Sequence, residues 1–129
     1  MRWLLIAFAG LGLTACVSLP DAPQPAAALI GTWLPLENGI VHPLACDSGL
    51  PIIYQADGRY LLFEEEGRWS LTGSRLTETA IAATEAGDPA EIALGQPLVS
   101  TLRFLDPNRF RKRLADGSQI ELRRCPSSR

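Results

Sequence analysis

The sequence has few of the residues that enzyme and metal sites usually need. It contains one histidine, His42, and three cysteines among 129 residues, and the cysteines lie far apart in the sequence, without the close cysteine pair of a typical structural zinc site. It has no glycine-rich phosphate loop and no G-x-S-x-G turn around a nucleophilic serine. A single histidine followed by proline, in an expected loop, is more often structural than catalytic. We therefore expect a protein that is not an enzyme and that binds no metal and no cofactor.

Long apolar runs are also missing, apart from one at the start of the chain. The run MRWLLIAFAGLGLTAC, residues 1–16, is shorter than the roughly 20 apolar residues of a membrane-spanning helix and has the layout of a secretory signal. Its end, LTAC, resembles the lipobox of bacterial lipoprotein precursors. That resemblance implies removal of residues 1–15 and attachment of lipid to Cys16. The alternative is a plain secretory peptide cut after Ala15, which leaves a free thiol.

The residues that follow indicate where such a lipoprotein resides. Val17, rather than aspartate, follows the cysteine, which by analogy with that family favours the outer membrane, with the protein facing the periplasm. Residues 17–29 contain three prolines and four alanines and have the composition of a tether. We therefore divide the chain into a signal peptide (1–15), a lipid anchor with its tether (16–29) and a folded domain (30–129). The membrane is the expected partner of the anchor, and nucleic acid is not expected in this compartment.

The two remaining cysteines predict a disulfide. With Cys16 assigned to the anchor, Cys46 and Cys125 form an even pair in an oxidising compartment. A bond between them encloses most of the folded domain. We expect this bond in preference to a zinc site, because the two cysteines are distant in sequence and the chain has a single histidine.

Turn sequences recur along the domain at the spacing of an antiparallel meander. Between them lie short runs in which apolar and polar residues alternate, such as 98–104 and 120–123, as expected of strands with one buried face. The pattern predicts an all-β fold, a small antiparallel up-and-down β-barrel of about eight strands. The turn sequences are ENG (37–39), ADG (56–58), EEG (65–67), TGS (72–74), DPN (106–108) and ADG (115–117).

Two segments within this pattern need separate interpretation. Residues 87–95, GDPAEIALG, carry helix-start signals at Asp88 and Pro89 and a stop at Gly95, which predicts one short helix. The glutamates of EEEG, residues 64–67, are expected to form a solvated hairpin tip, where nothing shifts their pKa toward catalytic use.

Charge is distributed unevenly along the domain. Residues 17–102 hold eleven acidic and three basic residues, whereas residues 103–129 hold three acidic and eight basic ones. One interpretation is a basic face that binds an anionic envelope component. The other is that basic strands lie beside acidic turns and balance them. The candidate basic face consists of Arg109, Arg111, Lys112, Arg113, Arg123 and Arg124.

The aromatic residues suggest a second route to function. Aromatic side chains occur on successive expected strands, and a small barrel either fills with them or keeps a ligand cavity. The segment LIGTWLPL, with Gly31 and Trp33, is similar to the G-x-W motif that opens the first strand of lipocalins. That resemblance implies a lipocalin-like barrel for a small apolar ligand, with a late arginine (Arg113, Arg123 or Arg124) packed over the tryptophan. The candidate ligand-binding residues are Trp33, Tyr54, Tyr60 and Trp69.

A protein-interaction module is the competing class of function. Membrane-bound lysozyme inhibitors are also small disulfide-bearing lipoproteins with a β-barrel. The segment SLTGSRLTET, residues 70–79, is only loosely similar to their inhibitory loop. An inhibitor of this kind, or an accessory protein of envelope assembly, therefore stands as the alternative to ligand binding.

Overall fold

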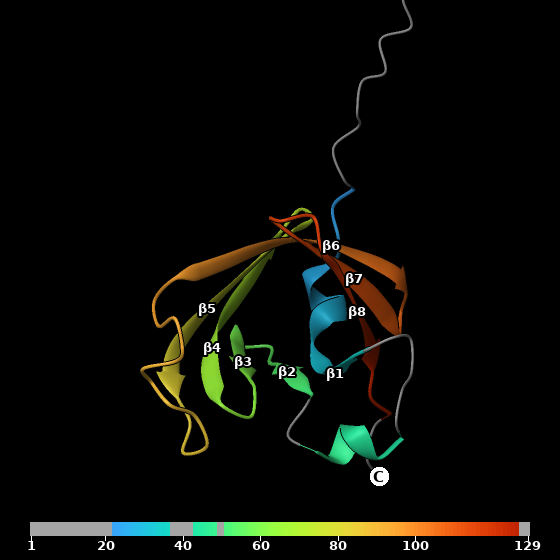
Figure 1. Cartoon of the computed structure of the whole chain (residues 1–129). Coiled ribbons are helices and arrows are strands. Elements are labelled where there is room, and N and C mark those ends of the chain that lie inside the picture. Colours follow the sequence, from blue (N-terminus) through green and yellow to red (C-terminus); the bar gives the residue numbers. More distant parts are fainter. Residues whose placement is uncertain (1–21, 37–42, 49–50, 127–129) are drawn as a thin grey trace, which may run out of the picture.

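The protein is a closed barrel of eight antiparallel strands (Figure 1). The computed structural model describes residues 22–36, 43–48 and 51–126. Each strand pairs with the next along the chain, and β8 pairs with β1, which confirms the expected up-and-down barrel. Two short 3-10 turns, η1 (Ala26–Leu29) and η2 (Pro43–Asp47), accompany the sheet. The strands are β1 (Gly31–Pro35), β2 (Ile52–Tyr54), β3 (Arg59–Leu61), β4 (Glu65–Thr72), β5 (Arg75–Ala83), β6 (Pro97–Asp106), β7 (Arg109–Leu114) and β8 (Gln119–Arg124).

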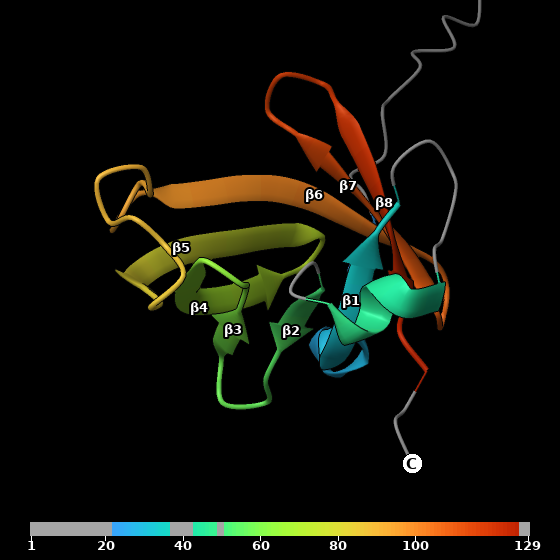
Figure 2. The same ribbon diagram turned by 60° about the horizontal axis from the view of Figure 1, so that its bottom comes forward.

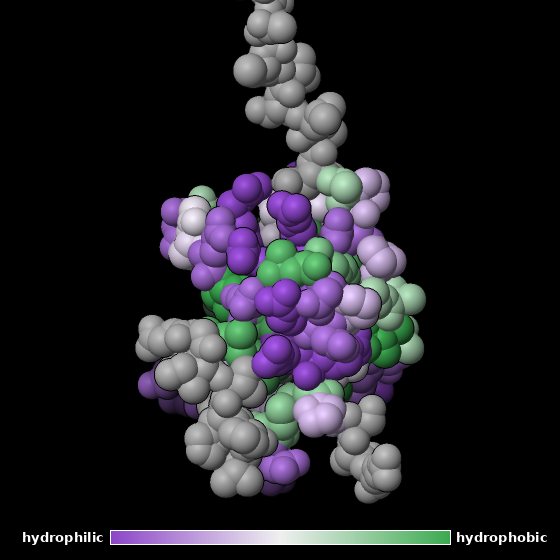
Figure 3. Space-filling view, turned by 90° about the vertical axis from the view of Figure 1, so that its right-hand side faces the viewer, coloured by the Kyte–Doolittle hydropathy of each residue, from purple (hydrophilic) through white to green (hydrophobic). Residues whose placement is uncertain are grey.

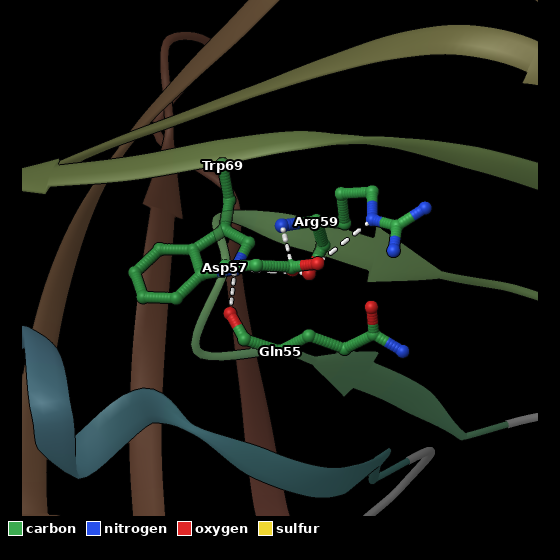
Figure 4. Close-up of polar contacts among 4 residues, drawn as sticks. All are labelled: Gln55, Asp57, Arg59 and Trp69. Atoms are coloured by element: carbon green, nitrogen blue, oxygen red, sulfur yellow. Dashed lines mark hydrogen bonds and ion pairs between the residues drawn. The ribbon is translucent and has the colours of Figure 1, made fainter.

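Aspartate-glycine turns form two of the strand connections, β2–β3 and β7–β8. Between β2 and β3, Gly58 adopts φ +86°, a conformation that suits glycine, and the Asp57 carboxylate accepts a hydrogen bond from the Arg59 backbone N–H at 3.1 Å. The indole N–H of Trp69 in β4 lies 3.1 Å from both the Gln55 and the Arg59 carbonyl oxygens (Figure 4). This contact fastens the β2–β3 hairpin to the neighbouring strand. The turn between β7 and β8 has the same Asp-Gly sequence, and Gly117 adopts φ +87°.

The glutamate cluster is not a simple hairpin tip. Strand β4 begins at Glu65, because the Leu62 N–H donates to the Glu65 carbonyl at 2.8 Å and closes the turn there. Only Glu64 stays in the turn and is exposed, whereas Glu65 is half-buried. A register shift between Glu66 and Gly67 marks a bulge at the start of the strand.

The expected helix at residues 87–95 is absent, and the segment forms successive turns instead. Asp88 does cap the segment locally, since its carboxylate accepts a hydrogen bond from the Ala90 N–H at 2.9 Å. Gly95 does end it, at φ +76°, but its N–H donates to the Ala80 carbonyl of β5 at 2.8 Å. Because the Gly95 end is held against β5, the single turn at residues 88–91 is not propagated into a helix. No helix among the described residues is long and apolar enough to cross a membrane.

The packed part of the protein begins before Ile30. Leu29 is fully buried in the core, and η1 precedes it within the segment expected to be a tether. Gln24 is held by two hydrogen bonds of 2.9 Å each, from its N–H to the Gly73 carbonyl and from the Phe104 N–H to its side-chain oxygen. The chain therefore reaches the barrel beside the β4–β5 turn. In Figures 1 and 2 η1 (blue) lies well apart from the loop between β5 and β6 (yellow to orange).

Most of the large core side chains gather at one end of the barrel. This end contains the first residues of β1, β5 and β7 and the last residues of β4, β6 and β8. The Trp33 ring lies 4.6 Å from that of Phe110 and 6.1 Å from that of Phe104, and the Tyr54 ring lies 5.7 Å from that of Trp69. Together with Leu29 they fill this end, which we call the closed end.

The predicted disulfide is present. Cys46 of η2 is bonded to Cys125, directly after β8, with the two Cα atoms 5.8 Å apart. The Cys125 N–H also donates to the Thr32 carbonyl of β1 at 2.9 Å. The bond therefore ties the β1–β2 connection to the seam where the barrel closes.

Removing this bond is expected to destabilise the barrel. The two cysteines are 79 residues apart in sequence. The chain-entropy relation gives a loop of that size a stabilisation of about 4.5 kcal/mol, as an upper guide. Urea unfolding should show similar losses for Cys46→Ser and Cys125→Ser and no larger loss for the double variant. Additive losses in the double variant would contradict a bond between the two.

Candidate functional site: an open cavity in the barrel

The other end of the barrel is hollow. A cavity of about 510 Å³ opens there, between the last residues of β1, β3, β5 and β7 and the first residues of β2, β4, β6 and β8. Its wall is mostly apolar, and the loop 84–96 contributes residues at the mouth. The apolar lining includes Ile52, Leu62, Ala80, Leu98, Ile120 and Leu122.

Small side chains and short strands leave this space unfilled. Strands β2 and β3 have three residues each, and Ala80 occupies an inward position of β5. Tyr60 is the one aromatic residue in the lining, because the other core rings lie at the closed end. The loop 84–96 is held beside the mouth, since the Thr84 hydroxyl donates to the Phe63 carbonyl at 2.6 Å and the Thr84 N–H to the Glu64 carbonyl at 3.0 Å.

A buried ion pair forms part of the cavity wall. The ammonium of Lys112 in β7 lies 2.8 Å from one carboxylate oxygen of Glu78 in β5, and the two side chains are only 11% and 6% exposed. The Tyr54 hydroxyl donates to the other Glu78 oxygen at 2.8 Å. Each carboxylate oxygen thus has a donor, as burial of a charged group requires.

A second tyrosine-carboxylate contact lies on the same wall. The Tyr60 hydroxyl donates to the Glu65 carboxylate at 2.8 Å. Burial first, and then the neighbouring carboxylate, raises the pKa of each tyrosine: Glu78 acts on Tyr54 and Glu65 on Tyr60. Both phenols therefore stay neutral donors at physiological pH. The surroundings of the cavity disfavour an additional negative charge.

At the closed end an arginine covers the tryptophan of the first strand. The guanidinium of Arg124 lies 4.2 Å from the centre of the Trp33 ring, and its N–H groups donate to the carbonyls of Ile30 (2.9 Å) and Ala28 (2.7 Å). The Trp33 indole N–H donates to the Leu29 carbonyl at 2.8 Å. Of the three arginines that the sequence left open for this position, Arg124 occupies it.

Gly31 makes this arrangement possible. It adopts φ +139°, which side-chain-bearing residues rarely adopt, and a Cβ there would lie 2.5 Å from the Arg124 guanidinium. The spacing of Gly31 and Trp33 therefore has a direct physical cause: the glycine leaves room for the arginine that packs on the tryptophan two residues later.

The structure separates the four candidate ligand-binding aromatics. Tyr60 lines the cavity. Trp33 and Tyr54 are buried at the closed end, and half-buried Trp69 packs beside them. Only one of the four is thus placed to touch a molecule in the cavity.

The six candidate basic residues do not form one face either. Lys112 points into the barrel, and Arg124 is engaged with Trp33 and backbone carbonyls. The other four lie outside on β7 and β8, where Arg109 contacts Asp106 at 2.7 Å and Arg111 contacts Glu121 at 3.7 Å. Arg103 pairs in register with Arg111 and extends this set onto β6. Figure 3, which shows the side where β6–β8 lie in Figure 1, is largely hydrophilic.

Sequence reasoning missed Glu78 and Lys112 as interior residues, although the alternation of the strands contains the signal. Glu78 lies between the inward residues Leu76 and Ala80, and Lys112 lies two residues after buried Phe110. Period-two alternation therefore places both side chains inside. Cys16 and His42 fall outside the described residues. Among the residues that are described, no group of three or more His, Cys, Asp or Glu side chains is arranged to hold a metal ion.

Comparisons with known proteins identify no family for this chain. No protein-family model, no curated protein and no solved structure gives a significant match.

The ion pair yields a stability prediction. Lys112→Met leaves the Glu78 carboxylate buried without its cation and should cost about 3 kcal/mol of unfolding free energy. Adding Glu78→Gln removes the charge while keeping an acceptor for Tyr54, and should recover most of that loss. The matched control is Arg111→Met in the same strand, whose exposed ion pair is expected to contribute less than about 1 kcal/mol. Urea denaturation that ranks the two single variants equally would contradict the role given to Lys112.

Proposed function

We propose that this protein binds a small apolar or amphipathic ligand in the barrel cavity and is not an enzyme. The observation that carries the proposal is the open, mostly apolar cavity of about 510 Å³, within the roughly 300–1,000 Å³ range of small-molecule sites. Gly31, Trp33 and Arg124 add a similarity to lipocalins, in which an arginine from a late strand packs over the tryptophan of the G-x-W motif. That similarity supports a carrier or sensor of small molecules rather than a catalyst.

We further propose that the protein is a lipoprotein anchored through Cys16 in the outer membrane and facing the periplasm. The support is the LTAC sequence and the expected signal peptide before it. Five residues lie between Cys16 and Ala22, so the two can be at most about 20 Å apart. Because Gln24 is bound next to the β4–β5 turn, the anchor attaches at the closed end. The cavity mouth then opens away from the anchoring membrane.

The anchor is tested by replacing its cysteine. Cys16→Ser should abolish incorporation of labelled palmitate and leave either unprocessed precursor or protein released by mild washing of the membrane fraction. Cys46→Ser is the matched control, because it removes a cysteine without touching the lipobox and should leave labelling unchanged. Palmitate incorporation that persists in Cys16→Ser would exclude this anchor.

The cavity is tested with a neutral fluorescent probe, N-phenyl-1-naphthylamine, and the mature chain (16–129) carrying Cys16→Ser so that no detergent is needed. We expect saturable one-to-one binding with a fluorescence increase. Ile120→Trp places a large ring in the cavity lining and should weaken binding at least about tenfold, since it removes much of the apolar volume. Ile81→Trp is the control, because Ile81 is 44% exposed and lies outside the lining.

A second cavity-filling variant controls for the possibility that Ile120→Trp loses binding through misfolding. Ala93→Trp fills the mouth from the loop 84–96 and leaves every strand unchanged. Probe binding that is as tight in both cavity-filling variants as in the wild type would overturn the cavity as the binding site. Absence of binding by the wild-type chain would favour the alternative, in which the outer arginines of β6–β8 bind an anionic envelope component or a protein partner.

A further inference from the structure

The charged residues of the cavity are strongly unbalanced. Among the described residues of the lining, four carboxylates, those of Glu64, Glu65, Glu78 and Glu91, stand against one cationic side chain, Lys112. The charges of Lys112 and Glu78 offset each other within their ion pair. Three carboxylates remain without a cationic partner in the lining.

These three carboxylates lie at the open end. Glu64 is exposed in the turn between β3 and β4, Glu65 begins β4, and Glu91 is exposed in the loop 84–96. The two segments are fixed to each other, because the Thr84 N–H and hydroxyl donate to the Glu64 and Phe63 carbonyls. The arrangement is therefore built into the mouth, with acidic groups contributed from two sides.

The interior gives no compensating site for an anion. The Lys112 ammonium already contacts Glu78 at 2.8 Å. Tyr60, which lines the cavity, has a raised pKa because of burial and a nearby carboxylate, and an entering carboxylate would meet the same two effects. A cationic group, by contrast, is attracted toward all three unpaired glutamates.

We propose that the cavity selects amphipathic molecules with a cationic headgroup and discriminates against carboxylate amphiphiles such as fatty acids. The inference rests on the proposed function of the cavity as a ligand site. The apolar chain lies among Leu62, Leu98 and Ile120, and the cationic head lies at the mouth near Glu64, Glu65 and Glu91.

The test is displacement of N-phenyl-1-naphthylamine by three ten-carbon molecules that differ in their head: decyltrimethylammonium, decanol and decanoate. All are used at pH 7 below their micelle concentrations, with far-UV circular dichroism to confirm that the barrel stays folded. At an ionic strength of about 10 mM, where charges act over about 30 Å, the ammonium should displace the probe at a concentration at least about tenfold lower than decanoate. At about 1 M, where the screening length falls to about 3 Å, this difference should largely disappear.

Two variants test whether the glutamates at the cavity mouth produce the preference for the ammonium. Glu64→Gln and Glu91→Gln remove exposed rim charges without disturbing the ion pair, and each should reduce the preference for the ammonium over decanoate by about threefold, as expected for partly screened charges. Glu85→Gln is the matched control, because Glu85 is an exposed glutamate of the same loop outside the lining. It should reduce the preference less than either rim variant does, because its carboxylate lies farther from the cavity mouth.

The outcomes separate this inference from the proposed function. Displacement by decanol with equal or tighter binding of decanoate than of the ammonium would overturn the charge selection and leave the cavity as a ligand site. A preference whose size is the same in both rim variants as in the wild type would also overturn it. Failure of all three molecules to displace a bound probe would argue against amphiphile binding altogether.

Discussion

The packing around Trp33 is the contact on which the rest of the barrel depends. Its indole N–H is bonded to the Leu29 carbonyl, its face is covered by Arg124, and its edge meets Phe110. The same residue pairs in register with Arg124, so the strand at the start of the barrel and the strand at its end are joined where the ring is buried. One side chain thus connects the η1 segment, the closure of the sheet and the aromatic core. Gly31 is the condition for all three, because only a residue without Cβ leaves space for the guanidinium.

Concentrating the aromatics at one end leaves the other end open. A chain of this length has little apolar volume to distribute, and the three largest fully buried residues, Trp33, Tyr54 and Phe110, all lie at the closed end. The remaining inward positions carry alanine, branched aliphatic residues and one ion pair, which do not fill the space. The barrel is therefore filled at one end and hollow at the other. Aromatic rings pack the closed end, and the opposite end contains the cavity.

Much of the fold could be predicted from the sequence, and less of the site. Alternating residues and Asp-Gly turns defined the strands because a half-buried sheet imposes a period of two, and the two available cysteines allowed one pairing. The helix prediction at 87–95 failed because the helix signals of Asp88 and Gly95 are local, whereas the Gly95 N–H is paired with Ala80 in a strand fifteen residues away. The site could not be predicted from the sequence, because a cavity is the space that the packed side chains leave between them. Tyr54 and Tyr60 have the same residue type and similar burial, yet only three-dimensional packing determines which of them faces the open space.

The Glu78–Lys112 pair is difficult to explain by stability alone. A buried ion pair often contributes no more than apolar residues of the same size would, because desolvation offsets the attraction between the charges. Apolar side chains at these two positions would also have filled part of the cavity. The pair keeps polar atoms in the cavity wall, and Glu78 accepts the hydrogen bond of the Tyr54 hydroxyl. Because its two charges are opposite, the pair adds no net charge to the lining. Because the pair is neutral, Glu64, Glu65 and Glu91 determine the sign of the charge at the mouth. In the proposed ligand site, the apolar wall determines which apolar chain fits, and the glutamates at the mouth determine which headgroup lies beside them.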